Sequence, residues 1–355
     1  MSATSSSEIK GIKPAKWQQR LTAILEICGV YMVGQLIAFI FISLLGIELP
    51  NPIETLKANP NADLLEMSKT LALILLLQYG GILLPALAIG WWHRRRRLSE
   101  YGFTARQPIL QQLLTGIVLF TVAELPVKLL TVLDRFIPLG AKAVTQEIAY
   151  SLDWGDYKFW VFMAVGSFLL IPIVEELFYR GYVQTRLAED FDAPTAILIT
   201  ALFFTFSHGQ YYLTLSPWTI GTLLTGLFSV LAWGYVFYRT RSLLAVIVAH
   251  AIVNFPMRGA ADFILPIIMF CVVLIYRKQI LEAFRAFGSM LKLDVRSRIV
   301  TVIASVFITL FAITVAVAED MALLFGIAAL VFALVMEFVE KRKLKTPDKL
   351  LLEAE

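Results

Sequence analysis

The sequence predicts an all-α protein, a polytopic bundle of about 8–10 transmembrane helices with both termini in the cytoplasm. Hydrophobic residues make up 58% of its 355 residues and charged residues only 16%, and its mean hydropathy is +0.74. A typical soluble domain is about half apolar and about a quarter charged. The apolar residues also form long runs bounded by charge, and a helix needs roughly 20 such residues to cross a bilayer. Together these observations exclude an ordinary soluble protein.

About ten apolar runs are the expected spans. The first run is too long for the core of a cleaved signal peptide, so we expect it to stay in the mature protein. The fifth, seventh and eighth runs are short for a full crossing. In order, the runs are residues 21–46, 70–92, 109–132, 159–179, 194–208, 218–238, 243–256, 263–276, 299–318 and 321–338.

Basic residues gather in every second connection between these runs. They crowd the N-terminal tail (1–20), the loop at 93–106 and the C-terminal tail (339–355), whereas the intervening connections are acidic or mixed. Cytoplasmic loops carry an excess of Lys and Arg, so this alternation places both termini inside. The net charge of +4 therefore reflects topology, and we expect a lipid bilayer and no nucleic acid as a partner. The absence of a transit or retention signal favours a bacterial inner membrane.

The chain between the tails divides into three parts. A transmembrane core is expected over residues 21–278. Residues 279–298 carry apolar side chains at helical spacing with basic residues between them, which predicts a helix lying on the inner membrane surface. Residues 299–338 form an additional hairpin with ionisable residues only at its turn and its inner end, and we expect this hairpin to be structural.

The stretch IPIVEELFYRGY, residues 171–182, places Glu175, Glu176 and Arg180 at the end of an apolar run. A charged residue at the centre of a membrane helix costs roughly 2.5–3.5 kcal/mol, so this cluster needs a reason. Glu176 and Arg180 are four residues apart with the acid first, which puts them on one helix face as an ion pair. Glu175 points about 100° away around the helix, and a structural ion pair leaves it unexplained.

Two of the three histidines, His208 and His250, also fall within predicted spans, and Asn254 shares a helix face with His250. A carboxylate, two imidazoles and a carboxamide on three helices contain the parts of a hydrolytic site. Imidazole nitrogens suit Zn²⁺, and a carboxylate can bind the metal or accept a proton from an attacking water. We therefore expect Glu175, His208 and His250 around a zinc ion or a water, with Asn254 donating to the developing oxyanion.

Straight helices would keep these groups apart. At about 1.5 Å per residue, Glu175 lies roughly 8 Å from the helix end expected at Arg180, and His208 lies about 21 Å from Pro194. A fifth span that is short, tilted, or begins below the membrane surface after an embedded segment at 181–194 would bring the two groups together. We expect His208 within about 10 Å of Glu175.

Three patterns follow one another within the predicted spans. EELFYRG (175–181) matches EExxxR, FTFSH (204–208) matches FxxxH, and HAIVN (250–254) matches HxxxN. Over residues 159–256 the chain therefore resembles the CAAX prenyl endopeptidase and bacteriocin-processing family of multi-pass intramembrane proteases, also called CPBP or Abi proteins. It departs from the family pattern at Arg241, where members often have Gly, and in the final hairpin, which lies beyond the eight spans expected.

The resemblance implies a metalloendopeptidase-like site and a role for each residue. Glu175 would activate the water with Glu176 and Arg180 as its partners, His208 would stand beside Glu175 at the water or metal, and His250 with Asn254 would complete the site. Whether zinc or Glu–His water activation drives the reaction is left open. The implied reaction is hydrolysis of a peptide bond in a membrane-associated or lipidated substrate, as in C-terminal trimming, bacteriocin or pheromone maturation, or signalling cleavage.

Two other interpretations stay open. Glu26 in the first span, and Glu124 with Pro126 and Lys128 in the third, are features that a proton-coupled transporter could show, although the two halves lack a matching pair of interrupted helices. A non-catalytic membrane scaffold or immunity protein of the same fold is the second alternative. The intact set of buried polar groups argues against it, because a lost enzyme has no physical reason to keep them.

Overall fold

The structure, a computed structural model, describes residues 17–47, 55–56, 59, 62–93, 101–102, 107–140, 152–209, 216–256, 261–317 and 319–345. Within these ranges the chain consists of helices and short connections and contains no strand, so the predicted all-α fold class is confirmed. Much of the basic tails and of the loop at 93–106 lies outside the described residues. The cytoplasmic placement of the termini stays a prediction.

Each of the ten predicted runs is helical, although several helices begin or end elsewhere. In chain order the helices are α1 (Trp17–Leu44), α3 (Leu64–Ala88), η1 (Ile89–His93), α4 (Ile109–Asp134), α6 (Tyr157–Met163), η3 (Ala164–Phe168), α7 (Leu170–Glu176), η4 (Leu177–Gln184), α8 (Thr185–Leu187), α9 (Ala193–Phe206), α10 (Pro217–Thr240), α11 (Leu243–Val253), α12 (Ala261–Ile275), α13 (Arg277–Met290), α14 (Val295–Val317) and α15 (Glu319–Lys345), where η marks π-helical segments.

Six of the described helices are long and apolar enough to cross a membrane, and there are seven if the bent pair α12 and α13 is one span. α9, α11 and residues Leu324–Met336 of α15 are shorter apolar helices. At about 1.5 Å per residue, the 14 residues of α9 cover roughly 21 Å of a hydrocarbon core about 30 Å thick. The protein is thus an integral membrane protein in which short apolar helices accompany full spans.

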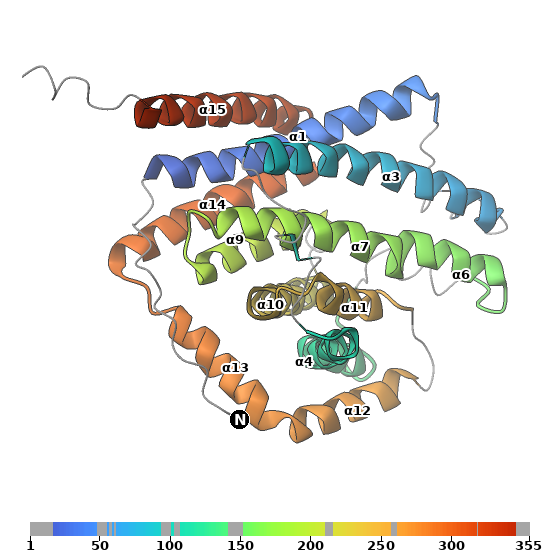
Figure 1. The fold of residues 1–355 in the computed structure, drawn as a ribbon. Helices are drawn as coiled ribbons and strands as arrows, with labels where there is room; N and C mark the ends of the chain where they lie inside the picture. Colours follow the sequence, from blue (N-terminus) through green and yellow to red (C-terminus); the bar gives the residue numbers. More distant parts are fainter. Residues whose placement is uncertain are drawn as a thin grey trace, which may run out of the picture.

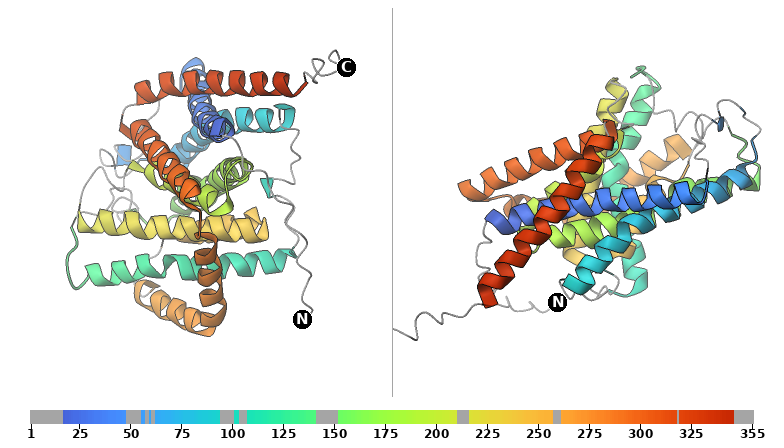
Figure 2. Two further views of the ribbon diagram at one scale, coloured as in Figure 1. Left: turned by 90° about the vertical axis from the view of Figure 1, so that its left-hand side faces the viewer. Right: turned by 90° about the horizontal axis from the view of Figure 1, so that it is seen from above.

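The helices stack in layers (Figure 1). α15, α1 and α3 lie on one side, α14, α9 and the helix from α6 to α7 come next, α10, α11 and α4 follow, and α12 and α13 lie on the far side. Figure 2 shows that α4 and α10 run across the direction of α1 rather than beside it. The helices that carry the predicted site residues, α7, α9 and α11, meet in the middle of this stack.

α1 is held between α15 and α3 by close backbone approaches. A Cβ added at Gly29 of α1 would lie 2.7 Å from the Cα of Leu330 in α15. A Cβ at Gly34 would lie 2.8 Å from the nitrogen of Ile82 in α3. Small residues allow helices to approach this closely inside a membrane, where packing rather than the hydrophobic effect drives their association. The C-terminal hairpin is therefore docked on the core through α1.

The same hairpin braces α9. Thr195 Oγ1 of α9 and Thr301 Oγ1 of α14 are 2.7 Å apart, and the rings of Phe203 and Phe311 lie 5.9 Å apart further along the two helices. α14 thus packs along α9, which ends two residues before His208. These contacts join the hairpin to α9, and its purely structural role stays a prediction.

The predicted amphipathic segment at 279–298 consists of α13, the connection after it and the first turn of α14. α13 is bent by 75° from the apolar helix before it, and none of its residues is buried. Phe284 and Phe287 contact Phe228 and Tyr235 of α10, with ring centroids 6.1 and 5.4 Å apart. This is the geometry that a helix on a membrane surface needs, and its position at the inner surface stays a prediction.

Gly29→Ala is expected to destabilise the protein because the new Cβ meets the backbone of Leu330, which cannot rotate away. Overpacking of this kind typically costs about 1–3 kcal/mol, so the thermal unfolding midpoint in detergent should fall. Gly226→Ala in α10 is the matched control, since a Cβ there meets nothing within 4 Å. That variant should keep or raise the midpoint. Equal behaviour of the two variants would contradict the close approach of α1 and α15.

Candidate active site

The helix that carries Glu175 is longer than the sequence predicts. A fourth span ending at residue 179 is wrong, because the helix runs from Tyr157 to Leu187. Arg180 and Arg186 lie buried within it, and Arg186 Nε lies 2.9 Å from Oε2 of Glu26 in α1. Charged residues do not end this helix, because carboxylates inside the protein neutralise them.

The extension brings Glu175 and His208 to the same depth. Glu175 precedes the helix end at Leu187 by roughly 18 Å, and His208 follows the start of α9 at Ala193 by roughly 22 Å. Glu175 Oε1 and His208 Nε2 are 3.8 Å apart. The predicted proximity is confirmed, and the segment at 181–187 that precedes α9 is indeed embedded in the protein, where it continues the helix.

Glu176, Arg180 and His250 form a buried, hydrogen-bonded cluster beside Glu175. Glu176 and Arg180 are 0% exposed and His250 is 4% exposed. Glu176 Oε1 accepts hydrogen bonds from Arg180 Nη1 at 2.9 Å and from His250 Nδ1 at 2.8 Å. An unpaired charge at this position would be costly, so the three groups hold one another in place. The expected ion pair is present and also fixes the histidine of α11.

Aromatic rings enclose the Arg180 guanidinium. Its central carbon lies 4.9 Å from the ring centroid of Phe204 and 5.4 Å from that of Trp233. Phe204 also stacks on His208 at 4.6 Å, and Trp233 packs against His250 at 4.8 Å. The four-residue spacing in FTFSH therefore places the Phe204 ring between the Arg180 guanidinium and His208.

Each oxygen of the Glu175 carboxylate faces one of the two histidines. Its Oε1 lies 3.8 Å from His208 Nε2, and its Oε2 lies 3.8 Å from His250 Nε2. These separations are too long for direct hydrogen bonds, but a bridging water would reach both partners. Oε2 is buried and has no hydrogen-bond partner among the described residues.

The partners of the Nδ1 atoms define the state of both imidazoles. His208 Nδ1 lies 2.6 Å from the carbonyl oxygen of Phe204, which can only accept, so Nδ1 carries a proton. His250 Nδ1 faces the Glu176 carboxylate, which also accepts from Arg180. In a neutral imidazole a proton on Nδ1 leaves the lone pair on Nε2. In that tautomer the Nε2 atom of each imidazole, next to Glu175, carries the lone pair.

Tyr79 of α3 is a site contact that the sequence did not single out. Its hydroxyl donates to Glu175 Oε1 at 2.6 Å across 96 residues of chain. The only signal in the sequence was a tyrosine within an apolar run. No spacing pattern connects residues this far apart, so sequence reasoning had no means to pair them.

Asn254 is tied to the π-helical segment η3. Its Nδ2 donates to the Ser167 carbonyl oxygen at 3.1 Å, and Ser167 Oγ donates to the Asn254 carbonyl oxygen at 2.8 Å. The pair joins the end of α11 to the helix that carries Glu175. One N–H of the Asn254 amide remains for a further acceptor.

The donor types around Glu175 fit zinc, whereas their spacing does not. Two imidazoles with hydrogen-bonded Nδ1 atoms and a carboxylate are a common zinc ligand set. Tetrahedral zinc with bonds of about 2.1 Å separates its ligand atoms by about 3.4 Å, which is less than the 3.8 Å observed here. Within the described ranges, no group of three or more His, Cys, Asp or Glu side chains is arranged to hold a metal ion. Zinc binding stays a prediction.

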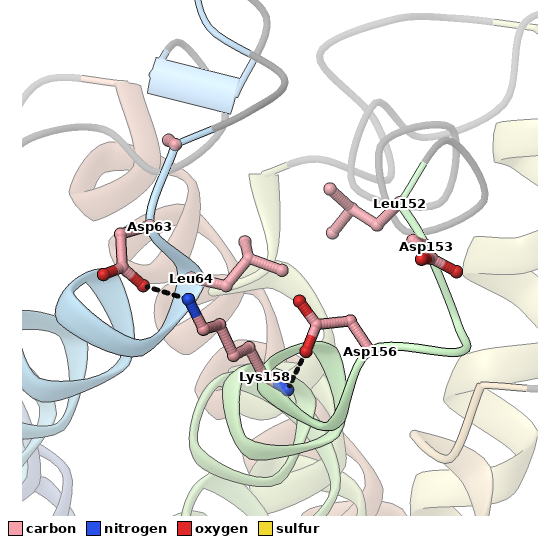
Figure 3. A pocket seen from close by; sticks show the side chains of 7 residues that line it. Asp63, Leu64, Leu152, Asp153, Asp156 and Lys158 are labelled. Carbon is pink, nitrogen blue, oxygen red and sulfur yellow. Dashed lines mark hydrogen bonds and ion pairs between the residues drawn. The ribbon is translucent and has the colours of Figure 1, made fainter.

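The pocket drawn in Figure 3 lies near the first residues of the helix that carries Glu175, between the start of α3 and the start of α6. Its volume is about 330 Å³. Asp63 and Asp156 cap α3 and α6 there, and Lys158 Nζ lies 3.5 Å from Asp63. The Leu65 N–H, and then Lys158, hold the pKa of Asp63 below its ordinary value. Helix capping thus accounts for these acids, and none of the predicted site residues lines the pocket.

The predicted site residues all lie in one stretch of the chain. Residues 157–256 match the family model described as type II CAAX prenyl endopeptidase Rce1-like. This stretch carries an Rce1-like domain. The match confirms the family resemblance for this segment, which begins with α6, ends after α11 and leaves Tyr79 outside, and it indicates a membrane protease. No curated protein and no solved structure matches the chain.

Arg180→Met is expected to destabilise the Rce1-like domain strongly, by about 3–5 kcal/mol, because it leaves the buried Glu176 carboxylate without its cation. The double variant Glu176→Gln/Arg180→Met removes both charges and keeps an acceptor for His250 Nδ1. It should recover part of the lost stability, measured as the thermal unfolding midpoint in detergent. A double variant less stable than the single one would contradict mutual neutralisation of the pair.

Proposed function

We propose that the Rce1-like domain is an intramembrane endopeptidase that hydrolyses a peptide bond with a water activated by Glu175 and the two histidines. The observation that carries this proposal is the convergence of the Glu175 carboxylate with His208 Nε2 and His250 Nε2, each at 3.8 Å. Three separate elements, α7, the end of α9 and α11, supply these groups.

Glu175 is assigned the role of general base. A water held between the carboxylate and an Nε2 lone pair would donate one hydrogen bond to each, which leaves an oxygen lone pair for attack. Burial of the site strengthens these interactions, because little solvent screens them. Proton transfer from water to a carboxylate by itself is unfavourable, and the adjacent carbonyl of the substrate makes it productive only during attack.

The reaction then follows with all atoms accounted for. The water oxygen bonds to the peptide carbonyl carbon while its proton passes to Glu175. The remaining N–H of the Asn254 amide is the proposed donor to the oxyanion of the tetrahedral intermediate. Collapse of that intermediate breaks the C–N bond, and Glu175 returns its proton to the leaving amine nitrogen.

Glu176 and Arg180 are proposed to act through His250. The Glu176 carboxylate accepts the His250 Nδ1 proton at 2.8 Å, which keeps the Nε2 lone pair directed at the reaction centre. Arg180 Nη1 holds that carboxylate in place at 2.9 Å. These two residues therefore position a catalytic group without contacting the substrate.

We infer that the substrate is a peptide or protein, with or without a lipid, whose scissile bond reaches a site inside the membrane. The burial of Glu175 and His250 among apolar helices supports this inference, as does the description of the matching family. A bacterial inner membrane with the protein's termini in the cytoplasm is the proposed setting, on the strength of the basic loops.

The acids that suggested a transporter have partners on neighbouring helices. Glu26 accepts from Tyr182 and Arg186, both at 2.9 Å. Glu124 accepts from Ser229 of α10 at 2.8 Å. Each carboxylate thus joins two helices, which gives it a structural role and favours the peptidase over the carrier.

Glu175→Gln and His208→Ala are each expected to lower cleavage of a fluorogenic peptide library by at least about 100-fold, the usual contribution of a general base or its partner. Both variants should remain folded in detergent, because Glu175 and His208 lie outside the buried ion pair of Glu176 and Arg180. Glu66→Gln is the matched control, since Glu66 is an exposed glutamate that forms a salt bridge with Lys69. Full activity of Glu175→Gln would contradict the proposal.

The role of zinc is tested by elemental analysis of the same preparations and by cleavage in the presence of a chelator. The observed ligand spacing predicts cleavage that persists in the chelator. About one zinc per chain, lost together with activity in His208→Ala, would show instead that the three donors close on a metal.

A further inference from the structure

Glu175 has one polar partner that none of the three sequence patterns contains. Tyr79 donates to its Oε1 at 2.6 Å, a short distance typical of a hydrogen bond from a hydroxyl to an ionised oxygen. The other carboxylate oxygen, Oε2, has no hydrogen-bond partner among the described residues. The two oxygens of this carboxylate are therefore in different situations, and Tyr79 makes the difference.

This asymmetry matters because a carboxylate is poorly fixed by its own side chain. The last torsion of a glutamate is broad and roughly two-fold, so the plane of the carboxylate turns unless a partner holds it. A bond to Oε1 fixes that plane. It leaves Oε1 3.8 Å from His208 Nε2 and Oε2 3.8 Å from His250 Nε2.

We propose that Tyr79 is a positioning residue of the active site, which holds the Glu175 carboxylate in the orientation that faces both histidines. α3 thereby contributes to a site that otherwise lies within residues 157–256. The inference rests on the proposed peptidase function for its kinetic consequence but not for the hydrogen bond itself.

A purely structural role would be to tie α3 to α7, and the chain contains a control for it. Tyr182 donates to Glu26 Oε1 at 2.9 Å, which is the same pair of groups joining the helix of the Rce1-like domain to α1. That pair is part of a buried cluster with Arg186, and Tyr182 lies about 10 Å along the helix from Glu175. Tyr79→Phe and Tyr182→Phe each remove one hydroxyl from one tyrosine–glutamate bond.

The kinetic test compares the two variants with wild-type protein in detergent on the same fluorogenic peptide. Tyr79→Phe is expected to lower kcat by about 10- to 100-fold, the effect of one hydrogen bond to a charged group, with KM unchanged within about two-fold. Tyr182→Phe should keep kcat while its unfolding midpoint falls. Equal kcat values for the two variants would overturn the positioning role.

A second measurement does not depend on activity. The infrared carboxylate bands of Glu175 can be identified by their loss in Glu175→Gln, and their frequencies report the hydrogen bonds to that group. The bands should shift in Tyr79→Phe, because the carboxylate loses its hydroxyl donor. They should stay unchanged in Tyr182→Phe.

The two measurements separate this inference from the proposed function. A shifted carboxylate band in Tyr79→Phe, together with a wild-type protein that cleaves no peptide, would uphold the link between Tyr79 and Glu175 and overturn the peptidase. Unshifted bands in Tyr79→Phe would overturn the inference whether or not the protein is a peptidase.

Discussion

The buried ion pair between Glu176 and Arg180 is the interaction on which the site depends. Two opposite charges with no exposed surface are costly to separate, because either one alone would remain buried and unpaired. Glu176 accepts from His250 as well as from Arg180 through Oε1, while Glu176 Oε2 and Arg180 Nε have no hydrogen-bond partner among the described residues. The guanidinium lies against two aromatic rings. The cost of burying the pair fixes the position of α11 against α7, and with it the geometry of the site.

From this pair the organisation extends outward in both directions along one helix. Toward the start of the helix, Glu175 is held by Tyr79 of α3, and Ser167 is joined to Asn254 at the end of α11. Toward its end, Arg186 is joined to Glu26 of α1. α1 is in turn pressed between α3 and α15 by close approaches at glycines. Helices outside the Rce1-like domain thus support the single helix that carries both glutamates.

Much of the fold and of the site could be predicted from the sequence, because the signals involved are local. The lengths of the apolar runs predicted the helices. Four-residue spacing predicted that Glu176 shares a helix face with Arg180 and Phe204 with His208. The end of the fourth span was predicted wrongly because Arg186 is neutralised by Glu26, a partner 160 residues away. The hydrogen bond between Tyr79 and Glu175 was missed for the same reason, since burial and long-range pairing are set by packing rather than by spacing.

The central claim is that Glu175 and His208 act together on one water molecule. The most direct test is a double-mutant cycle on kcat/KM with Glu175→Gln, His208→Ala and the double variant, all confirmed as folded in detergent. If both groups act on the same water, the account predicts that the double variant is no more than a few-fold worse than the more damaged single variant. Losses that multiply in the double variant would show that the two residues act independently and would contradict the account.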